Sequence, residues 1–307
     1  MSAEVPSGPG TDPAACAAEA LRLLQTHAYF ADRVDWDSVT AQVSRAANQG
    51  ASVVWALRPV WRALGDRHSF LRPARAQPEA TLDAEGNVPD GWRPPPDLGY
   101  LRLPAISAGP RTPAALRYVE AAWARLREQP RPAGWVLDLR GNSGGSVVPM
   151  LAAVGPLLGE GEWLSYQRRD GSRLSYRYSA GEVLAGGHRV LHAPSPPTND
   201  PQTAVAVLVD QRTASAAEGV VVAFRGRDRT RILGVPTAGV PTGNASYELA
   251  DGSVLFITTS LAVDHRGRCY AAALEPDMEG GLPEAHSWLN AQYRRGSNPG
   301  DTPQPST

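Results

Sequence analysis

Residues 135–145 read Trp-Val-Leu-Asp-Leu-Arg-Gly-Asn-Ser-Gly-Gly, an apolar run that passes into polar and glycine residues. Its first five residues predict a buried β-strand, and the glycines predict a turn. The apolar stretch 147–158 then predicts a helix. The same alternation continues outward, with strands predicted at 99–104, 203–209 and 232–235 and helices beginning at Thr112 and about Ser215. Alternating strands and helices predict the α/β class.

Two further features belong to this part of the chain. A hairpin is predicted at 163–178 around Asp170-Gly171, and a strand pair around Asp251-Gly252, because Asp-Gly favours tight hairpin turns. Residues 184–202 are rich in Gly and Pro and predict a loop.

The N-terminal part predicts a small bundle of three short helices. Asp12, which precedes a proline, and Asp35 are typical N-caps of the first two helices. The third begins near Ser52 and ends at Gly65, and Pro59 inside it should kink it or shift its start.

Composition and pattern together predict the layout of the whole chain. A helical domain is expected at 12–72 and a larger α/β domain at 99–295. The remaining parts are rich in small, polar and proline residues. They predict two disordered ends, 1–11 and 296–307, and a linker over 73–98.

The chain has 307 residues, and its Lys+Arg total of 30 consists entirely of arginine. The absence of lysine excludes a Schiff-base lysine, a P-loop lysine and a Ser-Lys dyad. The net charge of −1 argues against a nucleic-acid partner. Compositional bias of the genome explains the missing lysine most simply.

Other features of the composition predict where the protein works. Cys16 and Cys269 form no CxxC pair or disulfide framework, which fits a reducing compartment. The N-terminus lacks the charged and apolar regions of a signal peptide. No apolar run approaches the roughly 18 residues of a membrane span. A cytoplasmic protein without a membrane partner is therefore expected, and its oligomeric state is left open.

Three segments could carry chemistry: 65–70, 135–145 and 209–218. Ser215 begins a helix, where the dipole and free backbone N–H groups favour developing negative charge. The Gly-rich turn lets backbone amides point outward without side chains in the way. His68 follows the third helix and could act as the base that activates a serine.

These segments together resemble peptidase family S41, the C-terminal-processing and tricorn-type serine peptidases. DLRGNSGG at 138–145 is similar to the family's DLRxNxGG loop, TASAAE at 213–218 to its nucleophile segment, and GDRHSF at 65–70 to its histidine motif. GVPTAG at 234–239 and LEPD at 274–277 are similar to the family's GxPTxG and GVxPD motifs. The resemblance implies a ClpP/crotonase-like spiral ββα core in a catalytic domain over 99–295, acting on peptide or protein substrates without a cofactor.

The resemblance also implies roles for single residues. Ser215 would be the nucleophile, with Ala216, Gly144 and Gly145 as oxyanion-hole candidates. Val240 stands where the Ser-Lys branch of the family carries its lysine, so the implied base is His68. Asn244 stands where that branch has a glutamine.

The residue that orients His68 is the open part of the assignment. The acidic residue expected from the family falls at or next to Tyr270-Ala271, where this chain has none. Possible supporting residues are Asn244, Asp264, Glu275 and Asp66. The roughly thirty residues between Phe70 and Tyr100 are too few for the PDZ domain of many processing peptidases.

Three alternatives stay open. Residues 141–145 also match GxSxG, so an α/β-hydrolase-type esterase could use Ser143, with Asp210 or Asp228 and His265 or His286 as its partners. A catalytically degenerate S41-like protein could bind a peptide or a small apolar ligand. A Ser-His enzyme could also cleave an ester or a specialised peptide, because the acyl-enzyme steps are the same.

Other polar residues predict structural roles. The spacing of His27, His188, His192 and His286 is not that of metal ligands, so no metal site is expected. Glu218, three residues after Ser215, is typical of a capping box.

Overall fold

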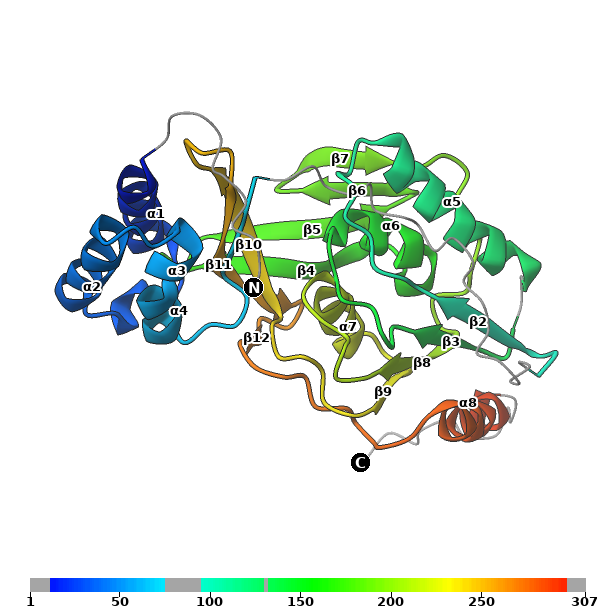
Figure 1. Cartoon of the computed structure of the whole chain (residues 1–307). Coiled ribbons are helices and arrows are strands. Elements are labelled where there is room, and N and C mark those ends of the chain that lie inside the picture. The colour runs from blue at the N-terminus through cyan, green and yellow to red at the C-terminus, as the bar shows by residue number, and fades with distance from the viewer. Residues whose placement is uncertain (1–11, 75–94, 130–131, 297–307) are drawn as a thin grey trace, which may run out of the picture. The chain divides into compact units, whose positions relative to one another are not determined.

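The computed structural model describes residues 12–74, 95–129 and 132–296 (Figure 1). The predicted disordered ends, apart from Gly296, and most of the predicted linker lie outside these residues. The chain divides into two compact units. Of the described residues, unit 1 takes 12–74, 168–172 and 242–260, and unit 2 takes the others.

The helices of unit 1 follow the sequence prediction. They are α1 (Pro13–His27), a 3-10 turn (Ala31–Arg33), α2 (Trp36–Asn48), α3 (Val53–Ala56) and α4 (Arg58–Leu64). Asp12 caps α1 and Asp35 caps α2 through their side chains. The predicted third helix is interrupted at Leu57, two residues before Pro59, and ends at Gly65 with φ 64°.

Unit 1 also contains a sheet built from distant parts of the chain. Its strands are β1 (Phe70–Arg72), β10 (Thr242–Glu248) and the first part of β11 (Val254–Asp264). β1 pairs antiparallel with β11, with Phe70 opposite Phe256. Leu249, Leu255 and Ile257 are buried in one core with the apolar faces of the helices. Unit 1 therefore extends beyond the helical domain predicted at 12–72, because the bundle buries its apolar face against these strands.

Unit 2 is built on a parallel four-stranded sheet in the order β2-β3-β8-β9 (Figure 1). Its strands are Leu98–Arg102, Gly134–Asp138, Ala204–Val209 and Thr230–Gly234. Residues that alternate along β3 and β8 enter two different cores. One core holds α5 (Pro113–Glu128), α6 (Val147–Leu158) and α7 (Ala216–Arg225), and the other holds α8 (Leu282–Gly296). The sheet is therefore covered on both faces.

An antiparallel series of strands completes unit 2. It consists of β4 (Gly161–Arg168), β5 (Arg173–Ser179), β6 (Glu182–Ala185) and β7 (His188–His192), and β12 (Cys269–Tyr270) pairs with the end of β11. The prediction of a loop over 184–202 is wrong for residues up to His192. There Gly186 and Gly187, with φ of 56° and 83°, form the turn of the hairpin between β6 and β7. Helix α8 was not predicted. Within the described ranges, no helix is long and apolar enough to cross a membrane.

Candidate active site

Ser215 lies between β8 and α7 and has an unusual backbone. Its φ is 53° and its ψ is −117°, values that a side-chain-bearing residue adopts only under constraint. Ala214 N–H donates to the carbonyl of Asn142 at 3.0 Å, and Ser215 N–H donates to Glu218 Oε2 at 2.9 Å. These two bonds hold the chain in the turn that presents a half-buried serine at the start of a helix.

The carboxylate of Glu218 connects α7 to the loop after β9. It is fully buried, and besides Ser215 N–H it accepts from Thr237 Oγ1 at 2.5 Å and from the N–H groups of Gly239 and Val240 at 2.9 Å. Burial raises the pKa of Glu218, and these hydrogen bonds act against that rise. The predicted capping box with Ser215 is present. Glu218 also fixes the loop that contains position 240.

The Gly-rich loop after β3 packs directly against the serine segment. Asn142 is buried, and its Nδ2 donates to the carbonyl of Leu103 at 2.8 Å while its Oδ1 accepts from Gly144 N–H at 2.9 Å. A Cβ on Gly144 would lie 2.8 Å from Ser215 Cβ and 3.0 Å from Ala216 N. Only glycine permits this approach, and Gly144 has φ 96°, which also favours glycine.

The three amides predicted for an oxyanion hole differ in their hydrogen bonding. Gly144 N–H is already bonded to Asn142. The N–H groups of Gly145 and Ala216 find no acceptor in the described part of the chain. Ala216 begins α7, so its amide is one of the unpaired donors at the positive end of that helix. Gly145 and Ala216 therefore carry the amides that are free to donate to an added negative charge.

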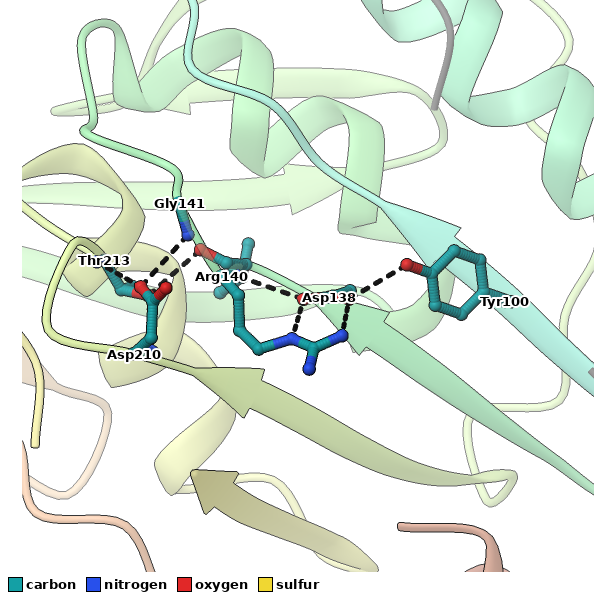
Figure 2. Close-up of polar contacts among 7 residues, drawn as sticks. Tyr100, Asp138, Arg140, Gly141, Asp210 and Thr213 are labelled. Carbon is teal, nitrogen blue, oxygen red and sulfur yellow. Dashed lines mark hydrogen bonds and ion pairs between the residues drawn. The ribbon is translucent and has the colours of Figure 1, made fainter. Parts of the chain in front are cut away.

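A buried carboxylate anchors the start of the Gly-rich loop, as Figure 2 shows. Asp138 accepts from Arg140 Nε at 2.9 Å, from Arg140 Nη2 at 2.6 Å and from Tyr100 Oη at 2.9 Å. Burial, followed by the charge of Asp138, raises the pKa of Tyr100 well above its usual value. The bidentate pair fixes Arg140 at the end of β3.

A second carboxylate, that of Asp210, connects the Gly-rich loop to the segment that contains Ser215 (Figure 2). Asp210 Oδ1 accepts from Gly141 N–H at 3.0 Å and from Thr213 N–H at 3.0 Å. Thr213 Oγ1 in turn donates to the carbonyl of Leu139 at 3.0 Å. The sequence suggests Asp210 only as an acid partner of Ser143. The structure gives it the role of fixing the Gly-rich loop beside the serine segment.

His68 lies in unit 1, on the turn between α4 and β1. Its Nδ1 is 2.6 Å from Thr242 Oγ1. Asp66 Oδ1 accepts from the N–H groups of His68 at 2.9 Å and Ser69 at 2.6 Å, and Asn244 Nδ2 donates to the His68 carbonyl at 2.8 Å. Burial lowers the pKa of His68, and the nearby charge of Asp66 acts in the opposite direction. Two of the four residues predicted to support His68 thus contact its backbone.

The other two predicted supporting residues have different contacts. Asp264 lies in unit 2, where it accepts from the N–H groups of Arg266 and Arg268 at 2.9 Å and from Tyr270 Oη at 2.8 Å. Glu275 is exposed in unit 2, and its backbone carbonyl accepts from Arg225. The sequence did not single out Thr242, since a threonine inside a predicted strand pair gives no signal of contact with a residue far away in the chain.

Ser143 has none of the features found at Ser215. It is exposed in the loop, and α6 begins only at Val147, after the N-cap Ser146. Among the described residues that are not glycine, positive φ is found at Ala180, Ser195, Ser215 and Arg229 and not at Ser143. Of the two serines, Ser215 is therefore the one that lies on a constrained turn between a strand and a helix.

The structure thus describes a half-buried serine with a constrained backbone at the start of a helix, packed beside a Gly-rich loop in a unit built on a parallel sheet. The profile of peptidase family S41 matches residues 97–280, which is more than half of the chain. The chain belongs to peptidase family S41. The predicted α/β fold with N-terminal helices is thereby confirmed.

Known proteins similar to this chain include a nisin-resistance protein of Lactococcus lactis subsp. lactis, which is 29% identical over 164 residues, 52% of this chain and 51% of that protein. A carboxyl-terminal-processing protease of Synechocystis sp. is 29% identical over 171 residues, 56% of this chain and 35% of that protein. The chain thus spans about half or less of the length of these relatives. The solved structure of a lipoprotein from Streptococcus agalactiae has a TM-score of 0.72 at 21% identity, covering 95% of this chain and 99% of that one.

Within the described residues, no group of three or more His, Cys, Asp or Glu side chains is placed to hold a metal ion. His188 and His192, which the sequence placed in a loop, lie on strand β7.

Proposed function

We propose that this protein is a serine peptidase that cleaves peptide or protein substrates through an acyl-enzyme. Membership of family S41 supports a peptidase, and the backbone of Ser215 is the observation that supports the assignment of its nucleophile. A strained serine is kept in a fold only where its surroundings impose it, and such positions cluster at functional sites. Ser215 is the nucleophile and His68 the general base.

In the proposed reaction, His68 Nε2 takes the proton from Ser215 Oγ, which attacks the carbonyl carbon of the scissile bond. The tetrahedral intermediate then expels the amine, which receives the proton from His68. In the second half of the reaction, His68 takes a proton from water, which attacks the acyl-enzyme, and the proton then passes to Ser215 Oγ as the acid product leaves. Proton transfer of this kind requires Nε2 and Oγ to lie about 2.6–3.2 Å apart.

The amides of Gly145 and Ala216 are the proposed donors to the oxyanion. Both are without an acceptor among the described residues, and Ala216 adds the positive end of α7. Gly144 N–H would first have to leave Asn142. Its proposed role is therefore to let the loop approach Ser215 closely rather than to donate.

Labelling with a fluorophosphonate tests the proposal without a known substrate. Wild type should react, whereas Ser215→Ala should not, and Ser143→Ala should react at the wild-type rate. His68→Gln should react about 10²–10⁴-fold more slowly, the usual contribution of a general base. Loss of labelling only in Ser143→Ala would assign the nucleophile to Ser143. A wild type that binds peptides but never reacts would indicate a degenerate binding protein.

The substrate class needs a separate measurement. We infer a peptide bond rather than an ester from family membership. Incubation with a mixture of peptides of defined C-termini, followed by mass spectrometry, should reveal fragments that Ser215→Ala does not produce. Turnover of a p-nitrophenyl ester with every peptide left intact would instead support an esterase. A cytoplasmic location stays a prediction.

A further inference from the structure

We propose that Thr242 is the positioning residue of His68, so that a neutral hydroxyl takes the place of the acidic residue that the sequence lacks. This inference rests on the proposed role of His68 as the base. It is carried by the contact of 2.6 Å between Thr242 Oγ1 and His68 Nδ1. Both residues belong to unit 1, and Thr242 begins β10 with its side chain buried.

The contact lies inside a larger set of bonds that fixes the His68 segment. Asp66 accepts from Ser69 Oγ at 2.8 Å, and Ser69 Oγ accepts from Thr258 N–H at 2.9 Å. Asn244 Oδ1 accepts from Thr258 Oγ1 at 3.1 Å. These bonds hold the backbone around His68, but Thr242 is the side chain bonded to the imidazole. The ring's orientation and tautomer therefore depend on Thr242.

The hydroxyl of Thr242 can accept from or donate to Nδ1, and the proposed mechanism uses the arrangement in which it accepts. When Nδ1 carries the proton and donates to Thr242 Oγ1, the lone pair of the neutral ring is on Nε2, which can then act as the base. Among the described residues, Thr242 Oγ1 has no other side-chain partner. An acidic residue in this place would also stabilise the protonated ring, whereas a hydroxyl supplies the orientation without the negative charge.

The charged residues directly before His68 in its turn are Asp66 and Arg67. Asp66, on the same turn, is the charge that acts on the imidazole. Thr242 and Asn244 from β10 and Thr258 from β11 are uncharged. A carboxylate placed at position 242 should therefore favour the protonated ring and move the acidic limb of the rate profile to higher pH.

The test compares Thr242→Val, Thr242→Ser and Thr242→Asp in full-length protein, with fluorophosphonate labelling rates measured across pH. Thr242→Val replaces the hydroxyl by a methyl group and keeps the shape of the side chain nearly constant. It should slow labelling about tenfold or more, because His68 Nδ1–H loses its acceptor. Thr242→Ser should stay within about twofold of wild type. Thr242→Asp should shift the acidic limb to higher pH. Thr259→Val is the matched control, since the Thr259 hydroxyl bonds to the carbonyl of Gly243.

Nitrogen NMR of labelled histidine gives a readout independent of activity. His68, identified by the signal lost in His68→Gln, should be the Nδ1–H tautomer in wild type and a mixture in Thr242→Val. A reactive wild type whose rate, pH profile and tautomer are all unchanged in Thr242→Val would overturn the inference. So would equal losses in Thr242→Ser and Thr242→Val, because serine keeps the hydroxyl and valine does not. An unreactive wild type would instead contradict the proposed function.

Discussion

Ser215 stores backbone strain in the ground state of the protein. A residue with a side chain at φ 53° and ψ −117° costs about 1–3 kcal/mol relative to a relaxed one. The bonds from Ala214 to Asn142 and from Ser215 to Glu218 oppose relaxation. These bonds thus hold Ser215 at the start of α7 in a strained conformation, which lowers the free energy of unfolding.

Replacing Ser215 by glycine should relieve this strain, whereas alanine should keep it. We expect Ser215→Gly to be more stable than Ser215→Ala by about 1 kcal/mol, because glycine adopts positive φ without steric cost. Urea unfolding of the two variants measures the difference, and both should fail to label. Equal stability of the two variants would show that the backbone is not strained at this residue.

The pKa of His68 leads to a pH dependence with a definite sign. Burial outweighs the charge of Asp66, so the folded pKa lies below the ordinary value of 6.5. The unfolded chain then binds the proton more readily, and the free energy of unfolding falls as pH drops below about 6.5. Wild type should lose more stability between about pH 7.5 and 5.5 than His68→Gln does. A larger loss of stability in His68→Gln would contradict a lowered pKa of His68.

At the scale of elements, the site consists of loops that follow parallel strands. The Gly-rich loop follows β3, the serine segment follows β8, and the loop containing Thr237 follows β9. Asp210 connects the first two, and Glu218 connects the last two. Because neighbouring parallel strands end at one edge of the sheet, residues far apart in the sequence meet there.

Two glycines of the Gly-rich loop offer a matched pair of substitutions. A Cβ on Gly141 would meet nothing within 4 Å, so Gly141→Ala should cost only the strain of its φ of 75°, about 1–2 kcal/mol. A Cβ on Gly144 would lie 2.7 Å from the Ala214 carbonyl oxygen and 2.8 Å from Ser215 Cβ. Gly144→Ala should therefore also slow labelling about tenfold or more, because the loop must move away from the serine. Equal labelling rates in the two variants would contradict this arrangement.

Local signals in the sequence were sufficient for most of the elements. Asp12, Asp35 and Gly65 placed helix ends correctly, because caps depend on residues close in the chain. The hairpin of β6 and β7 was missed because its Gly-Gly turn lies within a Gly- and Pro-rich stretch. The contact of Thr242 with His68 could not be predicted, since the two are 174 residues apart and their bond depends on how β10 and β1 both pair with β11.

At the scale of the whole molecule, the chain leaves unit 1 and returns to it twice. The helices at 12–64 bury their apolar faces with Leu249, Leu255 and Ile257. The N-terminal bundle is therefore part of a unit that is completed only after most of the chain has been made. The same return places β10, with Thr242, beside the His68 segment.

A core substitution tests whether these distant parts form one cooperative unit. Leu255 is fully buried, and Leu255→Ala should lower the free energy of unfolding by about 2–5 kcal/mol. Hydrogen exchange should show lost protection in α1 and α2 as well as in β11. Val54→Ala is the control, because Val54 is 42% exposed and its truncation should cost less than about 0.5 kcal/mol. Unchanged protection in the helices would contradict a shared core.

The most direct test of the central claim is to identify the residue that carries a fluorophosphonate adduct. Since the chain has no lysine, trypsin cleaves only after arginine, and it separates Ser215 on peptide 213–225 from Ser143 on peptide 141–168. We predict an adduct on 213–225, whose only serine is Ser215, and a much slower reaction in His68→Gln. An adduct on 141–168, or a His68→Gln protein that reacts at the wild-type rate, would contradict the assignment of Ser215 and His68.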